Sequence, residues 1–256
     1  MTKGILNTDF PKGQPVQLRL LRRIIGYKAY ALLKAIKLSF PITRETYSQS
    51  HEDLELKDFF PNEIGKYLDI GAGHPVYMSN TFFFYKLGWS GILVEPLTEN
   101  VILGRILRNR DRIIQGIVSA KRELTTFYEL DPSFYSTIDS DAVQKWLNFG
   151  AVIRKKGKIT SIPVSDMDFI CTPTEPCLVS IDVEGAELEV LNSFDWNRQK
   201  PRVFIIETWE GNSASNNQVD ALLTAQGYLK VKRIASNDVW CHITTVKLID
   251  SPPQET

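Results

Sequence analysis

Short apolar runs alternate with longer stretches of helical periodicity from residue 61 to the end of the chain. Runs of about four to eight apolar residues are typical of strands that are buried on both faces of a sheet. The expected strands are residues 66–70, 91–95, 112–118, 177–181, 202–206, 228–234 and 239–244. The expected helices are residues 76–87, 97–107, 186–194 and 217–226. This alternation predicts an α/β fold, a mostly parallel sheet with helices on both faces.

The strand–helix rhythm breaks between residues 121 and 164. Shorter extended runs at 124–130 and 158–164 replace the helices expected there. These runs predict an insertion or a β-hairpin, and we expect it to lie near the functional site.

The front of the chain is basic and amphipathic. Residues 10–43 contain seven basic residues and no acid, and apolar residues recur at helical spacing over 16–38. This pattern predicts a helix that either packs on the main domain or rests on an anionic membrane surface. The polar stretch 43–53 is typical of a linker or lid. We therefore expect an N-terminal helix and linker over 1–60 and one α/β domain over 61–256.

Composition excludes several classes of function. Thirty basic against thirty acidic residues leave no net charge, so nothing in the composition favours nucleic acid as a partner. The three cysteines form no Cys-x-x-Cys pair and are interpreted as reduced packing residues of an intracellular protein. The start lacks a signal peptide's apolar region, and no apolar run approaches the roughly 20 residues that span a bilayer. We expect a cytoplasmic protein, with peripheral membrane contact through residues 16–38 as the alternative.

A glycine turn and an acid follow the first two strands. The first strand runs through Asp69 into Gly71-Ala-Gly73, and the second ends in Glu95. Glycine lets the backbone approach a ligand, and an acid at this spacing accepts hydrogen bonds from ribose hydroxyls. A dinucleotide would need a third glycine, but Val76 stands there and Pro75 removes an amide donor. The pattern therefore favours S-adenosylmethionine, which has no phosphate, over a nicotinamide dinucleotide.

Acids recur where the predicted strands end. These acids are Asp69, Glu95, Asp182 with Glu184, and Glu207. Each of them could instead cap the helix that follows, where a carboxylate contributes only about 0.3–1 kcal/mol. Four strand ends at one edge of a parallel sheet favour a ligand site, because ligands bind at the carboxyl ends of such strands.

Longer motifs carry a resemblance to a known family. These motifs are Tyr67-Leu-Asp-Ile-Gly-Ala-Gly-His-Pro75, Ser79-Asn-Thr81, Tyr85-Lys-Leu-Gly-Trp-Ser-Gly91, Val94-Glu-Pro96, Arg108 with Asp111, Ser136-Thr137, Met167-Asp168, Asp182-Val-Glu-Gly-Ala-Glu-Leu-Glu-Val-Leu191 and Glu207. Over roughly residues 64–245 the chain resembles the FkbM-type S-adenosylmethionine-dependent methyltransferases. At Gly73 many relatives have a larger polar residue.

The resemblance implies a Rossmann-like class I methyltransferase fold, with an N-terminal helical extension that the similarity does not reach. It also implies methyl transfer to a hydroxyl oxygen of a sugar, glycan or secondary metabolite, with a small-molecule or glycan acceptor as the partner. Two alternatives from other classes are a nicotinamide-dependent oxidoreductase and a membrane-tethered, non-catalytic binding protein that keeps the fold.

The same resemblance assigns roles to single residues. The implied cofactor-binding residues are Asp69, Gly71, Ala72, Gly73, Glu95, Pro96, Val118, Ser119 and Asp182. Residues 71–73 would line the methionine half of the cofactor, with Asp69 near its amino group. Glu95 would accept the ribose hydroxyls, and Val118 and Ser119 would border the adenine.

Four residues are candidates for the chemistry. Asp182 is the first candidate for the base that takes the acceptor's proton, and Glu184 and Glu207 are the alternatives. The three carboxylates also offer oxygen ligands for Mg²⁺ or Ca²⁺. His74 follows the glycine turn and is either a proton carrier or a structural histidine.

Overall fold

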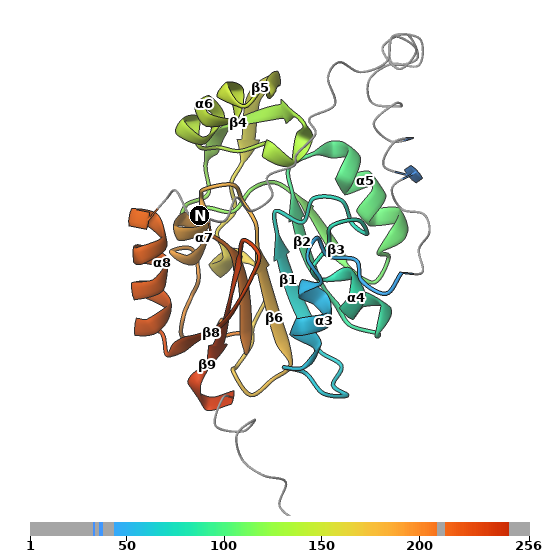
Figure 1. Ribbon diagram of the computed structural model, residues 1–256, viewed down its shortest axis with the longest axis vertical. Helices are drawn as coiled ribbons and strands as arrows, with labels where there is room; N and C mark the ends of the chain where they lie inside the picture. Colours follow the sequence, from blue (N-terminus) through green and yellow to red (C-terminus); the bar gives the residue numbers. More distant parts are fainter. Residues whose placement is uncertain (1–32, 34–35, 38–43, 209–212, 246–256) are drawn as a thin grey trace, which may run out of the picture.

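The computed structural model describes residues 33, 36–37, 44–208 and 213–245, and Figure 1 shows their arrangement. A seven-stranded sheet has the order β3-β2-β1-β6-β7-β9-β8. Its strands are β1 (Lys66–Ile70), β2 (Ser90–Glu95), β3 (Arg112–Gln115), β6 (Cys177–Ile181), β7 (Val203–Glu207), β8 (Tyr228–Ile234) and β9 (Asn237–His242). The helices around it are α3 (Glu52–Lys57), α4 (Phe82–Lys86), α5 (Thr98–Leu107), α7 (Glu187–Leu191) and α8 (Ser213–Ala225).

Five strands of the sheet run parallel, namely β3, β2, β1, β6 and β7, and β9 is antiparallel to both of its neighbours. The strand order reverses between β1 and β6, because the chain first builds outward to β3 and then returns to build outward to β8. Such a reversal leaves a crevice at the carboxyl ends of the two central strands, where open α/β sheets bind ligands. The Rossmann-like class I fold expected from the sequence is confirmed.

Separate hydrophobic cores lie on the two faces of the sheet. Leu68 and Ile70 belong to a core that α7 and α8 cover. Tyr67 points to the opposite face, into a core that contains residues of α3 and α4. Alternation along β1 thus sends Tyr67 and Leu68 into different cores, which explains why apolar residues stand next to each other in this strand.

Three predicted elements are shorter than their apolar patterns. The helix expected over 76–87 is restricted to α4, because Met78 has a left-handed backbone (φ 57°) that interrupts helical geometry before Thr81. The strand expected over 112–118 stops at Gln115, because the chain then leaves β2 and the amide of Ile117 donates to the carbonyl of Thr160 at 3.3 Å. The predicted helix 186–194 likewise ends at Leu191, and the last strand spans 237–242 rather than 239–244.

The segment 121–164 forms a small unit of its own, as the break in rhythm predicts. It contains β4 (Leu124–Asp131), the 3₁₀ turn η1 (Ser133–Tyr135), α6 (Ser140–Asn148) and β5 (Val152–Thr160), followed by the 3₁₀ turn η2 (Val164–Asp166). β4 and β5 pair antiparallel in a separate two-stranded sheet, with α6 between them in sequence. An insertion is therefore correct and a simple hairpin is wrong. The unit lies at the top of the molecule in Figure 1, beyond α7.

The polar stretch before α3 packs against the main domain. Asp53 is fully buried and accepts hydrogen bonds from the hydroxyls of Thr46 and Ser48 and from the amide of Tyr47. The Tyr47 ring meets Phe82 of α4 edge-on at 4.8 Å between centroids. The basic helix expected over 16–38 lies almost wholly outside the described residues, so that helix and the division at residue 60 stay predictions. No helix in the described parts of the chain is long and apolar enough to cross a membrane.

Candidate active site

The glycine turn after β1 lies directly against the end of β6. Gly71 has a left-handed backbone (φ 75°), and a Cβ at this position would overlap the carbonyl oxygen of Asp182. The amides of Gly71 and Ala72 both donate to the carbonyl of Val94, at 3.0 and 3.2 Å, so the turn crosses from β1 toward β2. Only glycine combines this backbone angle with this close approach.

Glu95 joins the turn to the end of β2. One oxygen, Oε2, accepts the amide hydrogen of Gly73 at 2.8 Å. The other, Oε1, accepts from the amide of Leu97 at 2.8 Å and from Asn100 Nδ2 at 3.3 Å. The side chain is almost completely buried, and this burial raises the pKa of Glu95 to about 8, although the two amides oppose the shift. The sequence predicted the position of Glu95 but gave no signal for Asn100.

Asp69 is held inside the domain by a neighbouring hydroxyl and a buried cation. Thr81 Oγ1 donates to its carboxylate at 2.5 Å. Burial raises the pKa of Asp69, and the positive charge of Arg108 opposes that rise. Thr81 and Arg108 thus hold the Asp69 carboxylate in place next to the glycine turn. Contact of Asp69 with the methionine amino group of the cofactor stays a prediction.

Arg108 and Asp111 form a buried ion pair under the first two strands. Arg108 Nε lies 2.6 Å from Asp111 Oδ2, and both side chains are inaccessible to solvent. Asp111 also accepts hydrogen bonds from the Tyr67 hydroxyl at 2.7 Å and from the Gly91 amide at 2.9 Å. Asp111 therefore links β1 to β2, and Arg108 balances its charge. This structural role explains why Arg108 and Asp111 are among the residues that carry the family resemblance.

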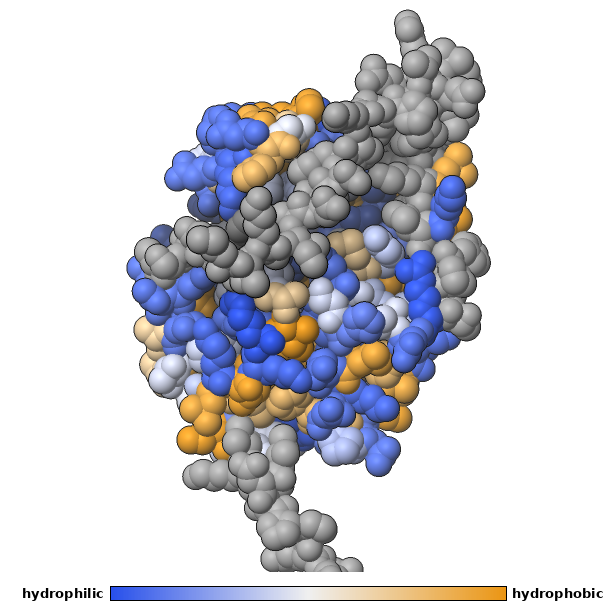
Figure 2. All heavy atoms as spheres, viewed as in Figure 1, coloured by the Kyte–Doolittle hydropathy of each residue, from blue (hydrophilic) through white to orange (hydrophobic). Residues whose placement is uncertain are grey.

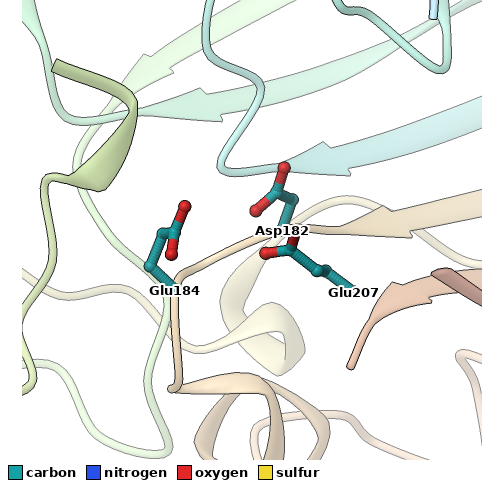
Figure 3. Close-up of side chains that lie close together, drawn as sticks. All are labelled: Asp182, Glu184 and Glu207. Atoms are coloured by element: carbon teal, nitrogen blue, oxygen red, sulfur yellow. The ribbon is translucent and has the colours of Figure 1, made fainter. Parts of the chain in front are cut away.

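Three carboxyl groups meet behind the glycine turn. Asp182 and Glu184 follow β6, and Glu207 ends β7. One carboxylate oxygen from each residue lies within 4.8 Å of those of the other two. Figure 3 shows the three side chains turned toward a common space. The sequence predicted all three residues, and the structure brings them together.

The surroundings favour the protonated forms of Asp182 and Glu184. Limited hydration raises the pKa of Asp182, and the nearby charges of Glu207 and Glu184 raise it further. The side chain of Asp182 is nevertheless exposed to solvent. Repulsion by the neighbouring carboxylates is therefore an important cause of its raised pKa, beside the loss of water. The pKa of Glu184 is also raised, first by burial and then by Glu207 and Glu187, while Lys145 opposes the rise. One oxygen of Glu207, Oε2, is buried and has no hydrogen-bond partner among the described residues.

The insertion unit docks on the loop that carries Glu184. Thr137 Oγ1 donates to the carbonyl of Glu184 at 3.2 Å and accepts the Asp139 amide at 3.0 Å. Glu184 has a left-handed backbone (φ 55°), and the neighbouring Gly185 amide donates to Glu187 Oε1 at 2.9 Å. Ser136-Thr137 belonged to the family resemblance, but nothing in the sequence indicated that Thr137 positions the backbone of Glu184.

The other predicted site residues lie near the same edge of the sheet. His74 Nδ1 accepts the amides of Val76 and Tyr77 at 3.1 and 2.9 Å, which agrees with the structural interpretation of this histidine. Val118 is buried in the core that α7 and α8 cover, and the Ser119 hydroxyl donates to the Lys121 carbonyl at 3.0 Å. Contacts of these two residues and of Pro96 with an adenine stay predictions.

The sheet and the residues at its carboxyl edge have the architecture of α/β proteins that bind a ligand at the reversal of strand order. A family model described as the methyltransferase FkbM domain matches residues 69–230. This match covers more than half of the chain, including the glycine turn, the acid cluster and the insertion unit. The chain belongs to the FkbM family of S-adenosylmethionine-dependent methyltransferases.

Solved structures with a similar fold include three methyltransferases. One is the C-terminal domain of precorrin-6Y C5,15-methyltransferase from Rhodobacter capsulatus, with 13% identity and a TM-score of 0.38 over 74% of this chain and 85% of that one. Another is 1,6-didemethyltoxoflavin-N1-methyltransferase from Burkholderia thailandensis, with 12% identity and a TM-score of 0.39 over 84% and 89%. A putative caffeoyl-CoA O-methyltransferase from Staphylococcus aureus has 9% identity and a TM-score of 0.44 over 89% and 100%. A search among curated proteins gave no match.

Proposed function

We propose that the chain transfers a methyl group from S-adenosylmethionine to a hydroxyl oxygen of a small molecule, sugar or glycan. The observation that carries this proposal is the carboxyl cluster directly behind the glycine turn. Gly71 packs against the main chain of Asp182, so a methionine group held by the turn would lie beside the cluster. A neutral hydroxyl is a weak nucleophile and needs a base at that place, which favours oxygen as the methyl acceptor.

The residues around the turn suit the proposed donor. A Cβ at Gly73 would meet little besides the carbonyl of Gly71 at 3.9 Å, so this side of the turn has room for a ligand. Glu95 is buried at the end of β2, where its oxygens can accept ribose hydroxyls. When bound, S-adenosylmethionine supplies a methyl group on a positively charged sulfur, and its C–S bond breaks as the acceptor's O–C bond forms.

In this proposal Asp182 removes the acceptor's proton as that bond forms. A carboxylate with a raised pKa is a stronger base, and Asp182 has both the shift and the access to solvent that an acceptor needs. Glu207 and Glu184 stand close enough to share the proton afterwards. The insertion unit holds the Glu184 loop and lies on the side where the acceptor would enter.

The same three carboxylates offer a second way to activate the hydroxyl. Oxygen ligands suit Mg²⁺ or Ca²⁺, and a bound cation would lower both the pKa of an acceptor hydroxyl and those of the carboxylates. An acid cluster alone does not define a cation site. The effect of a chelator on turnover therefore decides between Asp182 as the base and a metal ion that activates the hydroxyl.

The test is transfer of labelled methyl from S-adenosylmethionine into a panel of hydroxyl-bearing glycans and metabolites, with amine-bearing analogues alongside. We expect label in a hydroxyl acceptor, a loss of at least about 100-fold in Asp182→Asn, and normal turnover in Glu189→Gln. Glu189 is an exposed acid on α7 outside the cluster and serves as the matched control. Label only in amines would refute O-methylation, and unchanged turnover with chelator would refute a metal.

The membrane-tethered, non-catalytic alternative predicts donor binding without turnover on any acceptor. The nicotinamide alternative lacks support, since the family match points to a methyl donor. Enhanced NADH fluorescence on mixing with the protein would revive it.

A further inference from the structure

An apolar corner projects from the insertion unit where α6 ends and β5 begins. Three of its side chains are exposed, Phe149 by 56%, Val152 by 61% and Ile153 by 40%. Gly150 turns the chain between them with a left-handed backbone (φ 92°), as is common just after a helix. We call Phe149, Val152 and Ile153 the apolar corner.

The apolar corner rests on a rigid base. Trp146 and Ala151 beside it are buried with Leu130 in a separate small core. The Tyr135 ring stacks on Trp146 at 3.8 Å between centroids. The exposed side chains therefore do not belong to a poorly packed end of the unit, and their exposure is fixed by the fold.

The strand that follows the corner is strongly basic. β5 contains Arg154, Lys155, Lys156 and Lys158 and no acid. Arg154 pairs with Glu129 at 3.5 Å, and Lys158 donates to Thr126 at 3.0 Å. Lys155 and Lys156 are exposed. As successive residues of β5 they point to opposite faces of the two-stranded sheet, one on each side of the corner. Lys155 lies opposite Glu129 of β4. In Figure 2, hydrophobic side chains gather at the outer end of this unit beside hydrophilic ones.

We propose that the apolar corner and the two lysines that follow it dock the protein on an anionic membrane surface. Exposed apolar side chains on a convex corner can enter the boundary between headgroups and acyl chains, and flanking lysines are attracted to acidic lipids. A protein partner would be expected to offer a groove of the opposite shape, whereas a bilayer accepts a projecting corner without one. The inference is independent of methyl transfer and concerns a different segment from residues 16–38.

The geometry adds a consequence for orientation. The unit that carries the corner also holds the Glu184 loop through Thr137, and Figure 1 places it beyond the carboxyl edge of the sheet. A membrane bound at the corner would lie on the same side of the molecule as the acid cluster. Acceptors exposed at a bilayer surface would then reach the site from that side.

The test is cosedimentation of the full chain with vesicles of 30% phosphatidylserine in phosphatidylcholine and with vesicles of phosphatidylcholine alone. We expect binding to the anionic vesicles that weakens at high salt, because screening reduces the attraction of lysines. Neutralising both lysines (Lys155→Gln, Lys156→Gln) should weaken binding by about 25-fold, roughly fivefold for each charge. The combined Phe149→Ser, Val152→Ser variant should weaken it by at least about tenfold.

Exposed residues near the opposite edge of the sheet provide matched controls. Ile64 and Leu87 are 70% and 47% exposed, and Lys86 is exposed beside them. Ile64→Ser with Leu87→Ser, and separately Lys86→Gln, should leave vesicle binding unchanged. Unaltered thermal unfolding of the corner variants would show that they fold. The proposal is overturned if the parent chain ignores anionic vesicles, binds neutral ones equally well, or binds as tightly after the corner substitutions.

Discussion

The burial of Glu95 predicts that cofactor affinity depends on pH in a defined direction. Ribose hydroxyls donate hydrogen bonds to a carboxylate, so the ionised form of Glu95 is the one that binds. In the ligand-free protein burial raises the pKa of this carboxyl to about 8, so at neutral pH most molecules carry the protonated form. Binding then requires loss of a proton, and affinity should rise with pH until Glu95 is fully ionised.

The magnitude follows from the fraction of molecules that can bind. With a pKa of about 8, roughly one molecule in ten is ionised at pH 7 and one in a hundred at pH 6. The apparent Kd for S-adenosylhomocysteine should therefore fall about tenfold from pH 6 to 7 and about fivefold from pH 7 to 8. Above pH 9 it should level off.

Folding stability should change in the opposite direction. A carboxyl whose pKa is raised on folding binds its proton more tightly in the native state. Its contribution is fully present below the unfolded value near 4.5 and is lost as pH rises to about 8. The slope is at most about 1.4 kcal/mol per pH unit. Ligand-free protein should thus become less stable over the range in which it binds the cofactor better.

Isothermal titration calorimetry with S-adenosylhomocysteine from pH 6 to 9 measures the effect. Glu95→Gln cannot ionise, so its Kd should be nearly independent of pH and about 30- to 150-fold weaker than the parent's high-pH limit, since two charge-assisted hydrogen bonds become neutral. Glu99→Gln is the control, because the charge of Glu99 raises the pKa of Glu95 and Glu99 is not among the predicted cofactor-binding residues. That variant should bind normally with its pH midpoint shifted downward. An equal Kd at pH 6 and 9 in the parent chain would refute the reasoning.

Three further substitutions test other parts of the structure. Asp111→Asn should destabilise the fold by about 3–5 kcal/mol in urea unfolding, because it leaves the buried charge of Arg108 uncompensated; adding Arg108→Met should recover part of this loss. Gly71→Ala should cost at least about 2 kcal/mol in thermal unfolding and abolish cofactor binding, since its backbone angle and lack of space both exclude a Cβ; normal binding would contradict this. Thr137→Val removes the hydrogen bond to the Glu184 carbonyl, so turnover should fall at least about tenfold while cofactor affinity stays normal. An equal loss of turnover and of cofactor affinity would contradict a role for Thr137 in positioning Glu184.

The positions of most strands could be predicted, because burial on both faces of a sheet selects apolar residues along the whole strand. β1 and β6 match their apolar runs residue for residue. Helix lengths were less accurate, because local backbone geometry ends helices where the apolar pattern continues. The left-handed Met78 before α4 is such a case.

The acid cluster was predictable for a related reason. Carboxylates placed after parallel strands must meet at one edge, so Asp182 and Glu207 could be assigned to the same site without coordinates. The contacts of the insertion unit could not, since they depend on how a separate two-stranded sheet lies on the main one. The bond from Thr137 joins a side chain to a backbone carbonyl 47 positions away and leaves no pattern in the sequence.

The hydrogen bond from Thr137 to the Glu184 carbonyl also has a consequence for which substitutions the fold tolerates. Thr137 holds the Glu184 loop by its main chain, so the side chain at position 184 can vary without releasing the insertion unit. The backbone amides that bind the Glu95 carboxylate belong to Gly73 and Leu97, and neither residue lies in that unit. The segment from β4 to β5 could therefore change to suit another acceptor while the hydrogen bonds that hold Glu95 stay as they are.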